Sequence, residues 1–226
     1  MTGAVGGILG RPATWGLVWV VLAVVISWQM LTQFRPRVEG PAARWPNPGL
    51  EAEPVGEIIG PAAVIQEVVP DADGLRGIGV VLATYGRSDL PGEVIIRLKA
   101  NPGYAEDLVT YRRPLAEVKD GELLKVKFGP LSGVAGRRLF LIIESPGAAR
   151  GRAVTALRSK TDVYPAGRLF LNGRPVPGDL VFSLEYPRSF SEAASTLTGN
   201  RFGLLGPILA AAYIAGVFAL LGLTAP

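Results

Sequence analysis

Residues 75–99 read LRGIGVVLATYGRSDLPGEVIIRLK, and this stretch decides the fold class. Apolar side chains recur at every second position in 78–82 and again in 94–98, while Pro91-Gly92 between them is a turn signal. A period of two places one set of side chains on one face of a strand, where it can be buried. The stretch therefore predicts two β-strands joined by a loop.

The same alternation continues through 124–128, 139–143 and 180–186. Closely spaced Gly-containing turns separate these runs and leave no room for a long amphipathic helix. Residues 168–176 predict a hairpin, because Asn172-Gly173 suits the positive φ angles of a type I′ turn. We expect about eight to ten short strands that form a two-sheet sandwich or jelly roll with one core.

The two ends of the chain differ from this middle part in having almost no charge. All 19 acidic residues lie between Glu39 and Glu192. Residues 12–34 are uncharged and reach about 34 Å as a helix, enough to cross a bilayer. A cleaved secretory signal is the alternative, but the apolar run is long and no small-x-small cleavage pattern follows it, which favours an uncleaved anchor.

Residues 202–223 form a second uncharged run and predict a second transmembrane helix. Small side chains at four-residue spacing favour close helix packing in membranes. The residues expected to pack in this way are Ala23, Ser27, Ala211, Ala212, Ala215, Gly216 and Ala219.

These patterns predict a membrane-anchored all-β chain, with a single β-sandwich or jelly roll between two transmembrane helices. The expected parts are a tail (1–11), a first span (12–34), a proline-rich linker (35–54), the β-sandwich (55–188), a linker (189–201), a second span (202–223) and a tail (224–226). Five prolines between positions 35 and 54 favour an extended stalk with little regular structure that lifts the domain off the bilayer.

The composition excludes several kinds of chemistry. The chain has no Cys and no His, so thiolate, imidazole and the usual zinc chemistry are absent. Asp71-Ala72-Asp73-Gly74 resembles the start of a calcium loop but lacks the later ligands, and a turn is favoured. The net charge of +4 is modest and no basic stripe with interleaved aromatic residues is present, which argues against nucleic-acid binding. We expect no metal and no cofactor.

Several short motifs are spread over about residues 62–187. They are Leu75 to Val80, Ala83 to Arg87, Gly92, Ile96 to Leu98, Glu144 to Pro146, Ala153 to Thr155, Asp162 to Pro165 with Gly167, Leu171 to Gly173 and Gly178 to Phe182. Together they resemble an extracytoplasmic β-sandwich module of bacterial envelope proteins, and the resemblance implies a carbohydrate-binding-like jelly roll of the kind that often accompanies multi-spanning membrane glycosyltransferases. Two spans cannot supply the multi-helix core of such an enzyme.

The sidedness of the domain follows from this resemblance. Arginines beside the two spans nominally favour a cytoplasmic domain, but a long intervening segment can translocate regardless of its charge. The resemblance implies an extracytoplasmic domain, with both termini in the cytoplasm and the two spans in the cytoplasmic membrane.

A sugar site needs aromatic faces and a few polar groups that fix orientation. The candidate ligand-binding residues, on predicted loops and strand ends, are Tyr85, Arg87, Tyr104, Tyr111, Asp162 and Tyr164. The alternative for Tyr85 and Tyr164 is that each caps the core and hydrogen-bonds a neighbouring loop.

Three acids, Asp107, Asp120 and Asp179, are the candidates for a glycoside hydrolase pair, which needs two carboxyl groups about 5 to 9 Å apart. Each occurs in a context where Asp is an ordinary turn residue, and no catalytic residue is assigned. We expect a non-catalytic module for binding or scaffolding in envelope glycan or glycolipid handling, whose partners are the bilayer and an envelope glycan or a membrane glycosyltransferase. The alternative is a small accessory or assembly subunit of a larger membrane complex.

Overall fold

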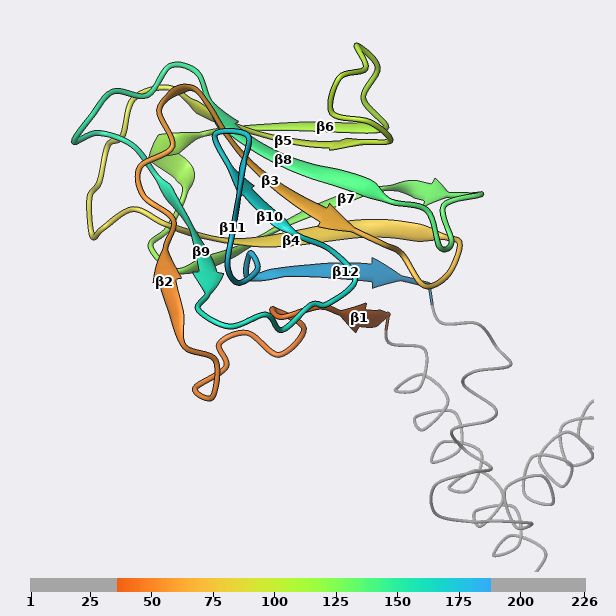
Figure 1. Ribbon diagram of the computed structural model, residues 1–226. Helices are drawn as coiled ribbons and strands as arrows, with labels where there is room; N and C mark the ends of the chain where they lie inside the picture. The colour runs from red at the N-terminus through yellow and green to blue at the C-terminus, as the bar shows by residue number, and fades with distance from the viewer. Residues whose placement is uncertain (1–35, 188–226) are drawn as a thin grey trace, which may run out of the picture. The chain divides into compact units, whose positions relative to one another are not determined.

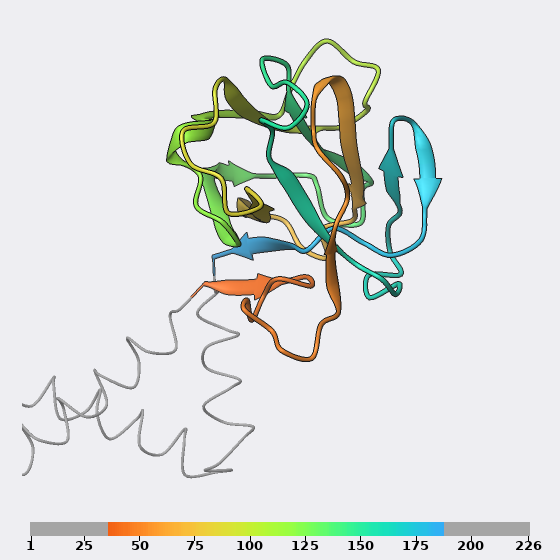
Figure 2. The ribbon, with the colours of Figure 1, turned by 90° about the vertical axis from the view of Figure 1, so that its left-hand side faces the viewer.

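The computed structural model describes residues 36–187, whose strands form two antiparallel sheets (Figures 1 and 2). Sheet one contains β1 (Arg37–Glu39), β2 (Ala52–Pro54), β4 (Leu75–Ala83), β7 (Glu122–Leu131), β9 (Thr155–Ser159) and β12 (Phe182–Tyr186). Sheet two contains β3 (Gly60–Val68), β5 (Glu93–Lys99), β6 (Val109–Pro114), β8 (Leu139–Ser145), β10 (Leu169–Leu171) and β11 (Arg174–Val176). A single 3-10 turn, η1 (Leu115–Glu117), joins β6 to β7 within the described residues. The two-sheet all-β prediction is thereby confirmed.

One hydrophobic core joins the two sheets face to face. Val80 and Leu82 of β4 are fully buried against side chains of the other sheet such as Leu98 and Leu141. The period-two runs therefore predicted correctly which side chains point inward. The described part of the predicted domain, residues 55–187, contains ten strands (β3–β12), in agreement with the eight to ten that were expected. The two additional strands, β1 and β2, lie in the segment 36–54.

The predicted hairpin at 168–176 is also confirmed. β10 and β11 pair with Leu171 opposite Arg174, and the two connecting residues, Asn172 and Gly173, have φ values of 52° and 74°. Positive φ at both positions is what a type I′ turn requires.

The structure differs from the predicted stalk at residues 35–54. β1 pairs with β12 and β2 pairs with β9, so both ends of the segment 36–54 belong to sheet one. Between them, the amide of Ala42 donates to the carbonyl of Phe182 at 2.7 Å, and the indole of Trp45 donates to the carbonyl of Gly121 at 3.1 Å. The prolines interrupt the strands without preventing the segment from folding, so the β domain begins at Pro36 and not at residue 55.

This segment covers the outer face of sheet one. Val81 and Val181 point away from the main core but are fully buried, because they pack with Ala42 in a second, smaller core. Partly buried side chains of Trp45 and Leu50 surround that core. β4 is consequently buried on both faces, whereas the sequence predicted one buried face.

The two points where the described chain begins and ends lie side by side. Arg37 is the register partner of Tyr186, and β12 runs antiparallel to β4 with Glu185 opposite Gly77. The pairing places the 69–74, 100–108 and 132–138 loops at the same end of the sandwich, which we call the exit end. The opposite end, called the far end, carries the loops 84–92, 115–121 and 146–154.

Among residues 36–187 no helix is long and apolar enough to cross a membrane. The predicted spans at 12–34 and 202–223, with their small packing residues, lie outside the described residues. The predicted linker at 189–201 lies outside them as well.

Candidate functional site

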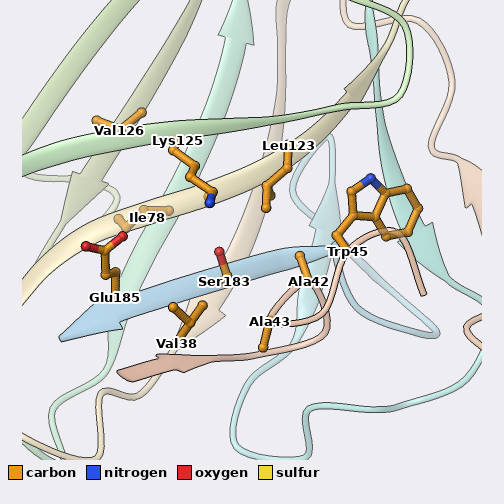
Figure 3. A pocket seen from close by; sticks show the side chains of 11 residues that line it. Val38, Ala42, Ala43, Trp45, Ile78, Leu123, Lys125, Val126, Ser183 and Glu185 are labelled. Atoms are coloured by element: carbon orange, nitrogen blue, oxygen red, sulfur yellow. The ribbon is translucent and has the colours of Figure 1, made fainter. Parts of the chain in front are cut away.

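A cleft of about 100 Å³ opens on the outer face of sheet one, and its floor is a glycine (Figure 3). Gly79 of β4 is paired with Lys125 of β7 on one side and with Ser183 of β12 on the other. A Cβ at position 79 would lie 2.4 Å from Ser183 Oγ and 2.9 Å from Leu123 Cδ1. The cleft therefore depends on a residue without a side chain at this position.

The 36–54 segment forms the other wall of the cleft. Val38 of β1 and Ala42, Ala43 and Trp45 of the following turn line it with apolar surface. Because the sequence predicted a stalk here, none of the cleft residues was a candidate in the sequence. The uncharged outer row of β4, Gly79 and Val81, is the signal that another part of the chain must cover this face.

Three polar side chains line the cleft opposite that wall. Figure 3 shows the ammonium group of Lys125 and the hydroxyl of Ser183 pointing toward one another across β4. The third, Glu185, lies farther along β12, and its Oε1 is 3.5 Å from a guanidinium nitrogen of Arg76. A cation, a hydroxyl and a carboxylate beside an apolar wall can orient a small hydroxylated group that also has an apolar face.

Tyr85 and Arg87, two of the predicted ligand-binding residues, lie together at the far end. The guanidinium carbon of Arg87 is 4.9 Å from the centroid of the Tyr85 ring, and Arg87 forms an ion pair with Glu57 at 2.5 Å. The amide of Gly151 and the Arg87 side chain both donate to Glu57 and lower the pKa of its carboxyl group. Arg87 thus lies over the Tyr85 ring, although the Tyr85 side chain is 43% exposed.

Tyr104 belongs to the 100–108 loop at the exit end, where it is 61% exposed. Tyr111 lies in β6 and packs partly buried against the main core. Asp162 is exposed in the loop between β9 and β10.

The remaining predicted residue, Tyr164, has an internal role. Its hydroxyl accepts from the amide of Val69 at 2.9 Å and donates to the carbonyl of the same residue at 3.0 Å. Its ring meets Phe182 edge-on at 5.0 Å between centroids. This is the core-capping alternative that the sequence left open for Tyr164. The structure therefore brings Tyr85 and Arg87 together but does not assemble all six predicted residues into one site.

The three acids considered for hydrolysis lie in different parts of the domain. Asp107 belongs to the exit end and Asp120 to the far end, while Asp179 is buried beside Gln66. Each accepts internal hydrogen bonds, such as the bond from the amide of Thr84 to Asp120 at 2.5 Å, which lowers the pKa of that carboxyl group. The structure does not place these three acids around a common cleft.

The acidic turn at Asp71 and Asp73 is an ordinary turn. The carboxylate of Asp73 accepts from the amides of Val134 and Ala135 at 2.8 and 2.9 Å, and Asp71 pairs with Arg37. In the described part of the chain, no group of three or more acidic, His or Cys side chains is placed to hold a metal ion.

No protein-family model matches this chain, and no curated protein is significantly similar to it.

Proposed function

We propose that this chain is a non-catalytic, membrane-anchored β-sandwich that binds an envelope glycan or the sugar headgroup of a glycolipid in the cleft above Gly79. The bilayer is its first partner, and the sugar-bearing molecule is its second. The expected location is the cytoplasmic membrane, with two spans and an extracytoplasmic domain.

The observation that carries this proposal is the composition of the cleft. Carbohydrates present hydroxyl groups around an apolar ring face, so their sites combine apolar or aromatic surface with a few polar side chains. Trp45 and Val38 supply the first kind of surface, while Lys125, Ser183 and Glu185 supply the second. The resemblance of the motifs between residues 62 and 187 to a carbohydrate-binding-like module supports the same ligand class.

Two further observations support the membrane anchor. The uncharged runs at 12–34 and 202–223 have the length of transmembrane helices. The described chain also enters and leaves the domain through neighbouring strands, with Arg37 opposite Tyr186, which suits a domain carried by two adjacent spans.

The experiment uses the full chain in lipid nanodiscs and an array of envelope polysaccharides and glycolipids. We expect Lys125→Ala to weaken the binding found for the native chain at least tenfold, because it removes the cation that lines the cleft. Lys127→Ala is the matched control, since Lys127 is exposed two residues farther along the same strand but does not line the cleft. The proposal fails if nothing on the array binds, or if both variants weaken binding equally.

The second candidate is an accessory subunit whose spans pack on a larger membrane protein. The chain enters and leaves the β domain at neighbouring strands, which favours this function. Two spans that follow from these points could enter the bilayer next to one another and present one joint surface. This function is favoured if the chain binds no sugar and if the triple substitution Ala211→Leu, Ala215→Leu and Gly216→Leu abolishes its co-purification with a defined membrane complex.

A further inference from the structure

We propose that the exit end of the sandwich lies directly on the bilayer surface, and that the 100–108 loop contacts the lipid headgroups through Tyr104 and Leu108. This inference rests on the membrane anchor of the proposed function. It is independent of the cleft and its ligand.

The length of the chain before β1 limits how far the domain can lie from the membrane. The first predicted span ends at Phe34, and β1 begins at Arg37. Three residues reach at most about 11 Å when fully extended. Because the 36–54 segment is folded into sheet one, no stalk separates the domain from the lipid.

The strand directions show which surface must then face the lipid. Arg37 begins β1 at the exit end, next to Tyr186 at the end of β12. β5 runs to the same end, where Lys99 is opposite Phe140, and the 100–108 loop follows it. The 100–108 loop, the start of β1 and the end of β12 therefore belong to one end of the sandwich (Figure 1).

This loop exposes the kind of side chains that prefer the bilayer interface. Tyr104 is 61% exposed and Leu108 is 42% exposed, and Tyr104 is the most exposed large hydrophobic side chain in the described part of the chain. Tyrosine favours the headgroup level, where its ring is apolar and its hydroxyl is hydrated. The loop is also held in place, because Lys99 Nζ donates to the carbonyl of Tyr104 at 2.6 Å and pairs with Asp107 at 3.1 Å.

The charges at the exit end are compatible with anionic lipid. Arg137 and Arg138 in the neighbouring 132–138 loop are exposed, and arginines near the surface attract anionic headgroups. Arg138 also pairs with Glu67 at 3.7 Å. The 100–108 loop carries one exposed acid, Glu106, so Arg137 is the main cationic contact expected. The acids of the 69–74 loop are engaged, Asp71 with Arg37 and Asp73 with backbone amides. Their negative charge is thus partly neutralised within the domain.

Tyr85 provides a matched comparison at the far end. It is also an exposed loop tyrosine, and it follows β4, which starts at the exit end and is 9 residues long. At about 3.3 Å per residue, this strand separates the two ends by roughly 30 Å. A label at position 85 should therefore not reach the headgroups.

The test is single-site fluorescent labelling of the full chain, which has no native Cys. Tyr104→Cys, Leu108→Cys and Tyr85→Cys are each labelled with bimane and incorporated into nanodiscs that contain anionic lipid and a headgroup spin-labelled lipid. We expect at least threefold stronger quenching at positions 104 and 108 than at position 85. Equal quenching at the two ends, or none at 104 in chains that have incorporated, overturns this inference alone. Failure of the native chain to incorporate into nanodiscs overturns the anchor, and with it both proposals.

Discussion

Asp179 shows how a single buried residue organises the domain. Only 1% of it is exposed, and its carboxylate accepts from the amides of Val163 and Tyr164 at 2.8 and 2.9 Å. The side-chain nitrogen of Gln66 donates to the other carboxylate oxygen at 3.2 Å, while the amide of Leu180 donates to the Gln66 oxygen at 2.9 Å. Burial raises the pKa of Asp179, and these donors oppose that effect.

Asp179→Asn should destabilise the domain by about 1–3 kcal/mol. An amide offers one acceptor and one donor group, so it would face either two backbone N–H groups or the Gln66 nitrogen with another N–H. The measurement is urea unfolding of the full chain in detergent. Asp162→Asn is the control, because Asp162 is exposed in the loop between β9 and β10 and its replacement should change the stability little. Equal stability of the two variants would contradict the expected role of the network.

The lowered pKa of Asp107 predicts how the free energy of unfolding changes as the pH falls. Burial alone would raise the pKa of Asp107, but hydrogen bonds from Thr110 and Arg97 outweigh it and lower the value from 3.8 to about 2. Because the folded-state pKa lies below the unfolded one, ionised Asp107 stabilises the fold above about pH 4, and this contribution is lost as the pH falls toward 2.

Asp107→Asn should therefore lower stability at neutral pH and flatten its dependence on pH between about 4 and 2. Unfolding midpoints of the native chain and the variant, measured across this interval, test the expectation. Glu106→Gln, an exposed neighbouring change, should leave the slope near that of the native chain. If stability depends on pH as steeply in the Asp107 variant as in the native chain, the ion pairs of Asp107 with Arg97 and Lys99 do not govern the sensitivity to acid.

At the scale of elements, residues 36–54 cover the outer face of β4, and we expect this cover to stabilise the domain. Val81→Thr should cost about 1–3 kcal/mol, because the new hydroxyl is buried between sheet one and Ala42. Val38→Thr is the control, since Val38 is on β1 and partly exposed. Thermal unfolding followed by circular dichroism compares the two. Similar small losses would mean that solvent reaches the outer face of β4.

The same elements show what the sequence could and could not predict. β4, β5 and the 169–176 hairpin were predictable, because alternation or an Asn-Gly turn is a local signal. β1 and β2 were not predictable, because each strand has only three residues, too few to show an alternating pattern. Pro54 lies within β2 and prolines lie close to β1, so both strands form only because they pair with distant strands. The cleft was missed for this reason, because one of its walls belongs to the segment 36–54.

The candidate binding residues show a similar division. Tyrosine, arginine and aspartate are residue types common in sugar sites, but only the fold determines which of these side chains lie close together. Tyr85 and Tyr104 are separated by the length of the sandwich, and the hydroxyl of Tyr164 is bonded to Val69. Such separation follows from strand order, which single-sequence periodicity does not contain.

For the whole molecule, the domain boundary can be tested by truncation. A fragment of residues 36–187 should unfold cooperatively, whereas residues 55–187 should lose several degrees of thermal stability or fail to fold. The shorter fragment lacks β1, β2 and Ala42, and it exposes Val81 and Val181. Melting curves and resistance to trypsin compare the two. Equal melting temperatures would mean that the first 19 residues of the unit contribute nothing to its stability.

The pairing of Arg37 with Tyr186 also bears on how such a chain can arise or be rebuilt. Opposed residues of an antiparallel pair have Cα atoms only about 5 Å apart, so excising everything between them leaves ends that a very short bridge can join. The β domain thus has the geometry of a cassette that can be inserted between two segments of a chain. An exchange of one such cassette for another would alter what the protein recognises without changing the distance between the points where the chain enters and leaves the cassette.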